Sequence, residues 1–264
     1  MRVPVLLFVL TCLSTALMGG PLYGVAVMII LLSHEFGHYL QARRYGVPAS
    51  LPYFLPLPFL SPFGTLGAVI AMRPHTATGR GLYDIAISGP IAGLIPTMIF
   101  AVIGLKQSSF VPNEDLPEGP AMLFGEPLLF EWLSELVLGP APPDHTLMLG
   151  ALGFAAWVGI FITALNLLPV GQLDGGHILF ALTPRYAHLV SQLIFGSAMI
   201  AVIVYQLWHW TLLLGLLLLL GLRHPPVSDQ PPFDLGLWRQ ILGWAMLLFV
   251  LIGLTPTPIS LSEP

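Results

Sequence analysis

The sequence has very little charge for its length. Only 8% of its 264 residues are Asp, Glu, Lys or Arg, whereas roughly a quarter of an ordinary soluble domain is charged. So few charged side chains cannot cover the surface of a soluble fold of this size. Hydrophobic residues make up 56% of the chain, and several apolar runs exceed the ~18 residues that indicate a bilayer span. The chain is therefore predicted to be a multi-pass integral membrane protein in contact with the lipid bilayer.

Basic residues and cysteines are also few, and this excludes two further features. The net charge is −4 and the sequence has no basic stripe that could follow a phosphate backbone, so no nucleic-acid partner is expected. Cys12 is the only cysteine, which excludes an internal disulfide.

The apolar runs predict an all-α membrane fold with about six to seven transmembrane helices and a small re-entrant β segment. The predicted spans are residues 3–19, 22–44, 82–104, 147–169, 187–206, 207–222 and 237–254. The short sixth span is expected to form a hairpin with the fifth. Residues 1–20 also have the pattern of a signal peptide. We expect a retained span instead, because Leu17-Met18-Gly19-Gly20 lacks a small-x-small cleavage pattern.

The segment 47–72 is apolar, yet its prolines exclude a regular helix. These prolines are Pro48, Pro52, Pro56, Pro58 and Pro62. Residues 64–72 have enough β-branched character for a short strand. Non-helical backbone at membrane depth is tolerated only beside protein or a watery cavity. We therefore predict a re-entrant or interfacial loop with a strand pair; the alternative is a proline-rich cytoplasmic linker.

The distribution of positive charge predicts the orientation of the chain. With the N-terminus in the cytoplasm, eight of the nine cationic residues lie inside, namely Arg2, Arg43, Arg44, Arg73, Arg80, Arg185, Arg223 and Arg239. Only Lys106 then lies outside, together with the acidic loop 105–146. The same assignment places the ends of the second and fourth spans nearer the cytoplasmic face.

The second span carries His34-Glu35-Phe36-Gly37-His38. Residues at i and i+4 project from one face of a helix, so both imidazoles can reach one metal ion. Glu35 is placed to take a proton from water, whose pKa zinc lowers. The pattern therefore predicts one zinc ion per chain, with His34 and His38 as ligands and Glu35 as the catalytic residue. The alternative is a polar cluster that hydrogen-bonds between helices.

The third ligand is expected where the fourth span ends. The candidates are Asp174, His177, His188 and His209. Pro169 and the following glycines break the helix, so Asp174 can turn back toward the membrane interior. Two histidines and a carboxylate with an open position form a common catalytic zinc site. This favours Asp174, although His177 is too close in sequence for this argument alone to separate the two.

These motifs together resemble the site-2 protease family of intramembrane zinc metalloproteases. The resemblance covers roughly residues 20–185 and includes His34 to His38, Asn166-Leu167-Leu168-Pro169 and Leu173-Asp174-Gly175-Gly176-His177. It implies zinc bound by His34, His38 and Asp174, with Glu35 as general base and acid. It also implies that Asn166 helps to bind substrate or to stabilise the oxyanion.

The predicted function is therefore zinc-dependent hydrolysis of a peptide bond within or near a transmembrane segment of another protein, as in regulated intramembrane proteolysis. The alternatives are a zinc transporter and a non-proteolytic membrane chaperone.

We expect a single membrane-embedded peptidase domain over 1–264, with a catalytic core at about 20–185 and accessory helices at 186–254. A homodimer is compatible with the sequence. Asp84 is expected to be structural, as a helix cap or a partner of Arg80.

Overall fold

The computed structural model describes residues 2–116 and 122–261. The helices are α1 (Arg2–Arg44), α2 (Gly79–Lys106), α3 (Leu128–Leu138), α4 (Ala151–Asn166), α5 (Asp174–Leu182), α6 (Ala187–Val204), α7 (Thr211–Leu220) and α8 (Gly236–Gly253). The strands are β1 (Tyr53–Pro56), β2 (Thr65–Val69), β3 (Ser109–Pro112), β4 (Met122–Phe124), β5 (His145–Met148) and β6 (Ile259–Leu261). They form three antiparallel pairs, β1 with β2, β3 with β5 and β4 with β6. The described part is mostly helical, as predicted, but the second and third strand pairs were not predicted.

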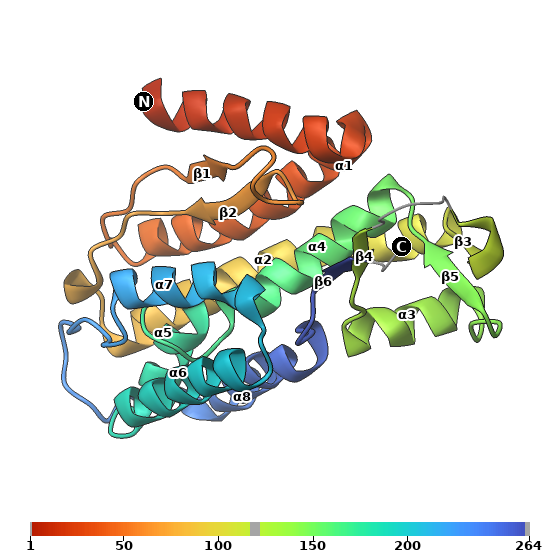
Figure 1. The fold of residues 1–264 in the computed structure, drawn as a ribbon. Coiled ribbons are helices and arrows are strands. Elements are labelled where there is room, and N and C mark those ends of the chain that lie inside the picture. Colours follow the sequence, from red (N-terminus) through yellow and green to blue (C-terminus); the bar gives the residue numbers. More distant parts are fainter. Residues whose placement is uncertain (1, 117–121, 262–264) are drawn as a thin grey trace.

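Helix α1 consists of two limbs that fold back on each other at Gly20 (Figure 1). Gly20 has φ 86° and ψ 167°, a conformation that residues with a Cβ rarely adopt. Pro21 follows it and lacks the N–H that a continuous helix would use. The two limbs occupy the predicted spans 3–19 and 22–44.

Among the described residues, four helices are long and apolar enough to cross a membrane: α1, α2, α6 and α8. Two predicted spans are shorter than expected. Helix α4 has 16 residues because β5 occupies the start of the predicted segment. Helix α7 has 10 residues and ends at Leu220, because the next residue, Gly221, has a φ of 89°. The predicted number of six to seven membrane crossings therefore stays a prediction.

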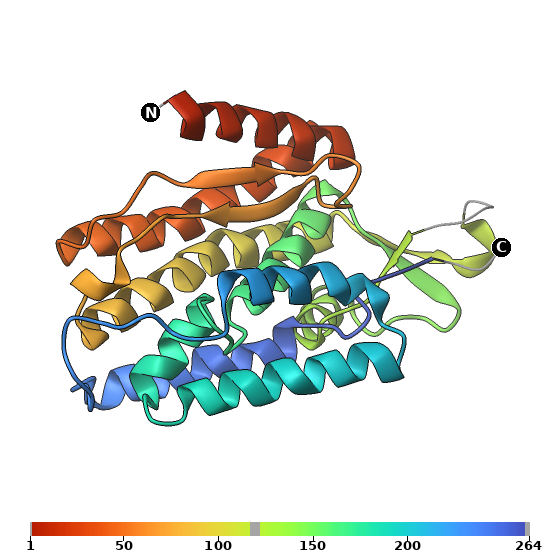
Figure 2. The same cartoon turned by 60° about the vertical axis from the view of Figure 1, so that its left-hand side comes forward.

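Helix α2 lies in the middle of the molecule, between α1 and the layer that contains α5, α6 and α8 (Figure 2). It packs directly against α1, α4 and α5. Close approach to α4 depends on small residues, because a Cβ added at Gly104 would lie 2.1 Å from the backbone nitrogen of Gly153. Tyr23, Leu31 and Trp157, all almost fully buried, form part of the main core between α1 and α4.

The β1–β2 pair lies alongside α1, within the proline-rich segment for which a strand pair was predicted (Figure 1). Two side chains of α1 hold the connection between the strands: Ser14 Oγ donates to Gly64 O at 2.5 Å, and Tyr23 Oη donates to Phe63 O at 3.0 Å. The strands are thus fixed against the same helix that carries His34 and His38. Whether they re-enter the membrane stays a prediction.

Candidate metal centre

His34, Glu35 and His38 lie in the second limb of α1, and all three side chains are buried. The helical repeat places the two imidazoles on one face, with ring centroids 4.8 Å apart. His38 Nδ1 donates a hydrogen bond to the carbonyl oxygen of Ile85 on α2 at 2.8 Å. That bond places the proton on Nδ1 and leaves the lone pair of Nε2 free to bind a metal.

Asp174 is the first residue of α5, and the bend before it brings its carboxylate to the histidines. Its Oδ2 lies 3.2 Å from Nε2 of both His34 and His38. The turn needs a very small residue, because a Cβ at Gly175 would lie 1.9 Å from the carbonyl oxygen of Leu167. The glycines after Asp174 therefore allow α5 to start against the end of α4.

The three side chains have the donor set and the spacing of a metal site. Their ligand atoms all lie within 4.8 Å of one another. Two ligands at ~2.1 Å from a tetrahedral zinc ion are about 3.4 Å apart, close to the 3.2 Å from Asp174 Oδ2 to each imidazole. Two nitrogens and a carboxylate oxygen with room for water are typical of catalytic zinc. The residues present therefore fit zinc.

The helix that supplies the histidines approaches α2 closely. A Cβ added at Gly89 would lie 2.1 Å from His38 Nε2, and one at Gly93 would lie 3.1 Å from His34 Cβ. The absence of side chains at Gly89 and Gly93 thus provides the space that the imidazoles occupy.

A cavity of about 330 Å³ adjoins these residues. Its walls include His34, Glu35, His38, Asn166, Asp174, His177 and residues of and beside β2. Asn166 Nδ2 lies 3.4 Å from His34 Nε2, so the amide donor faces the same space as the ligand atoms. The structure thereby brings together every site residue predicted from the sequence.

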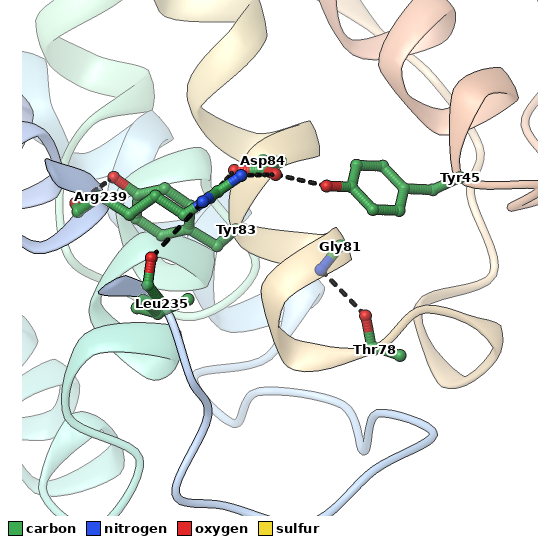
Figure 3. Close-up of polar contacts among 7 residues, drawn as sticks. All are labelled: Tyr45, Thr78, Gly81, Tyr83, Asp84, Leu235 and Arg239. Atoms are coloured by element: carbon green, nitrogen blue, oxygen red, sulfur yellow. Dashed lines mark hydrogen bonds and ion pairs between the residues drawn. The ribbon is translucent and has the colours of Figure 1, made fainter. Parts of the chain in front are cut away.

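Asp84 was expected to cap the helix or to pair with Arg80. It pairs instead with Arg239 on α8 (Figure 3). Arg239 Nε lies 2.7 Å from Oδ1, and Nη2 lies 2.9 Å from Oδ2. Tyr45 also donates to Asp84, and Tyr83 donates to the carbonyl oxygen of Arg239. Thr78, not Asp84, caps α2, by accepting from the amide of Gly81 at 3.0 Å. The pairing of Asp84 with Arg239 could not be predicted from neighbouring charges, because the two residues are 155 positions apart in the sequence.

His177 is not part of the metal group found among the described residues. Its Nδ1 lies 2.7 Å from Nε2 of His224, in the segment between α7 and α8. No role was predicted for His224, because no local pattern links it to a residue 47 positions earlier.

Residues 23–207 match the model of peptidase family M50. The chain is 34% identical over 248 residues to the probable zinc metalloprotease EGY1, chloroplastic, of Arabidopsis thaliana, with 91% of this chain and 43% of the relative covered. It is 31% identical over 245 residues to the probable zinc metalloprotease EGY2, chloroplastic, of Oryza sativa subsp. indica, with 89% and 43% covered.

This chain therefore spans less than half the length of these two curated relatives. No solved structure shows a significant match. Because the family model covers most of the chain and includes His34, His38, Asn166 and Asp174, the chain belongs to peptidase family M50, the site-2 protease family.

Proposed function

We propose that the chain is an intramembrane zinc metalloprotease, which hydrolyses a peptide bond within or near a transmembrane segment of a membrane protein. The observation that carries this proposal is the convergence of His34, His38 and Asp174, with Glu35 in the same cavity. These residues lie on or against helices that are long and apolar enough to cross a membrane. Ionisable groups at that depth are costly, so a catalytic role explains their presence.

Zinc would be held by His34, His38 and Asp174, and Glu35 would transfer protons as general base and acid. When bound, zinc supplies Lewis acidity and lowers the pKa of a water molecule. Glu35 takes the proton of the attacking water and passes it to the amine that leaves. Its burial, at 4% exposure, limits its contact to the cavity and so to the reacting groups.

Asn166 acts on the substrate carbonyl. Its Nδ2 donor faces the ligand atoms, 3.4 Å from His34 Nε2. A donor aimed at this space can stabilise the negative charge that develops on the carbonyl oxygen during attack.

A helical substrate must unwind before water can reach its carbonyl, because each carbonyl accepts an i→i−4 bond. Bare backbone groups cost several kcal/mol each in hydrocarbon. We propose that the substrate pairs with the free edge of β2. Ala71 and Arg73 direct their amides to Ser50 and Pro48, and strand alternation turns the amide of Ile70 to the other edge. Ile70 directly follows β2 and lines the cavity beside the metal centre, which supports pairing at this edge.

The proposed orientation places the N-terminus in the cytoplasm and the metal centre nearer that face. The arrangement of the loops supports this orientation. Elements β3, β5 and α3 lie at one end of the molecule, and the segment between α7 and α8 lies at the other end, where α1 begins (Figure 1). Arg223 belongs to that segment, and the amide of Ser228 in the same segment donates to the carbonyl oxygen of Ala77, which lies between Arg73 and Arg80 in the chain.

A zinc transporter receives no such support. In the part of the chain that the structure describes, one group of metal-binding side chains is found, whereas transport requires successive sites across the bilayer.

The decisive experiment compares the purified wild type with Glu35→Gln, using a panel of transmembrane substrates and metal analysis of both proteins. Cleavage by the wild type is expected, with zinc in both proteins and no cleavage by Glu35→Gln. Equal cleavage by the two proteins, or none by the wild type when zinc is bound, would refute the proposal.

A further inference from the structure

His177 and His224 form a buried pair next to the candidate metal centre. His177 lies one turn after Asp174 on α5 and is 8% exposed. Its Nδ1 lies 2.7 Å from His224 Nε2, and His224 Nδ1 lies 2.6 Å from the carbonyl oxygen of Pro225. The ring of Phe180 stacks on His224 at 3.8 Å with an interplanar angle of 5°. Both rings are therefore fixed in orientation.

The hydrogen bonds determine where the protons lie. A carbonyl oxygen only accepts, so His224 Nδ1 carries a proton and donates it to Pro225. Burial and the neighbouring His177 lower the pKa of His224 to about 3, so its ring is neutral and its Nε2 accepts. His177 must then donate from Nδ1 to His224. Because burial disfavours a charged ring, His177 Nε2 has no proton and presents a lone pair.

The ring of His177 lines the cavity, and its Nδ1 is directed to His224, which is not among the lining residues, so Nε2 is the ring nitrogen available to the cavity. Among the described residues, Nε2 of His177 has no hydrogen-bond partner. The buried side-chain nitrogen that lacks a partner in the described part of the chain is His188 Nδ1. His177 Nε2 is therefore accessible and not sealed inside the protein. His177 lines the cavity together with Glu35, Asn166 and Asp174. It is outside the group whose ligand atoms converge, so its lone pair is free for another purpose.

We infer that His177 Nε2 accepts a hydrogen bond from a backbone N–H of the unwound substrate, near the scissile bond. The inference rests on the proposed function and adds a substrate-binding residue to it. An unwound strand exposes N–H groups on both edges, and β2 can pair with only one of them. Asn166 offers an amide donor to the carbonyl oxygen, whereas His177 offers an acceptor to the amide. His224 is the positioning residue, because it fixes the tautomer and the ring plane of His177.

Two substitutions of His177 separate this role from a structural one. Asn places its amide near ring atom Nδ1, so His177→Asn keeps the contact with His224 and loses the acceptor in the cavity. Gln reaches the position of Nε2, so His177→Gln keeps an acceptor in the cavity and loses the contact with His224. If His177 binds substrate, kcat/KM falls about fivefold to tenfold in His177→Asn and less in His177→Gln, with zinc content unchanged in both.

A purely structural role gives the opposite order, with His177→Asn near wild type and His177→Gln impaired. That order would overturn the inference. Absence of cleavage by the zinc-loaded wild type would instead refute the proposed function, on which the inference rests.

Substrate variants provide a second, independent measurement. In a series of transmembrane peptides, one peptide bond at a time is replaced with an ester, which removes a single N–H. At one position beside the scissile bond, the ester is expected to slow the wild type about fivefold and to have no further effect on His177→Asn. If His177→Asn does not fold, His177→Leu takes its place. Ester effects that are identical in the wild type and the variant at every position would refute the contact.

Discussion

Arg239 holds both carboxylate oxygens of Asp84, with its Nε 2.7 Å from Oδ1 and its Nη2 2.9 Å from Oδ2 (Figure 3). This ion pair joins α8 to the first turns of α2. The next residue of α2, Ile85, provides the carbonyl oxygen that binds His38 Nδ1. The pair therefore fixes the part of α2 that orients a candidate ligand.

Arg239→Met is expected to destabilise the fold, because it leaves the Asp84 carboxylate, 11% exposed, without its cationic partner. The cost should be about 2 kcal/mol, which lowers the midpoint of thermal unfolding in detergent by roughly 4–8 °C. The matched control is Arg185→Met, since Arg185 is exposed. An additional Asp84→Leu should recover part of the loss. An unchanged midpoint in Arg239→Met would show that the pair contributes no stability.

Gly89→Ala is expected to weaken zinc binding. Its new Cβ would lie 2.1 Å from His38 Nε2, so the imidazole must move out of the metal position. The expected loss of zinc affinity is about tenfold or more, as for changes that misorient a ligand. Gly196→Ala is the control, because a Cβ there would meet nothing within 4 Å. Competition with a chromogenic chelator measures both variants, and equal affinities would contradict the close packing of α1 and α2.

The proposed ligand set predicts the metal content of four variants. His34→Ala, His38→Ala and Asp174→Asn should lose zinc, because each removes one of the converging donor atoms. Glu35→Gln should keep one zinc per chain, since it removes only proton transfer. Metal analysis of the purified proteins measures this. Full occupancy in Asp174→Asn together with loss in His177→Ala would identify His177 as the third ligand instead.

The orientation can be tested with single cysteines in a Cys12→Ser background. Glu135 on α3 and Asp234 before α8 are both exposed. Glu135→Cys should react with a membrane-impermeant maleimide added outside the cell, and Asp234→Cys should react only after permeabilisation, as the arginine distribution requires. The reverse pattern would invert the protein and place the metal centre nearer the outer face.

Ile70→Pro tests pairing of substrate with β2. Proline removes the Ile70 amide, so cleavage should fall about fivefold, the effect of one lost hydrogen bond, while zinc content stays normal. Ile70→Ala, which keeps the amide and shortens the side chain, is the control. Cleavage that is unchanged in Ile70→Pro, or equally reduced in both variants, would indicate that this edge does not pair with substrate.

The sequence by itself determined the class of the protein and the chemistry of its centre. Low charge and long apolar runs require a membrane environment, and the i, i+4 spacing of His34 and His38 places two candidate ligands on one helical face, whatever packs around that helix. The helix-breaking residues Pro169, Gly171 and Gly175 indicated that the chain could bend and direct Asp174 toward the membrane interior. These are local properties of backbone and composition, so they can be read without the fold.

Only the tertiary structure decided which distant groups meet. The contact of Asp174 with both histidines, the pairing of Asp84 with Arg239 and the contact between His177 and His224 each join residues far apart in the chain. Their separation in sequence leaves no periodic pattern. The same limit applies to the lengths of α4 and α7, because hydropathy reports which residues prefer an apolar environment and not where tertiary contacts end a helix. The packing of α1, α2, α5 and α8 determines these contacts.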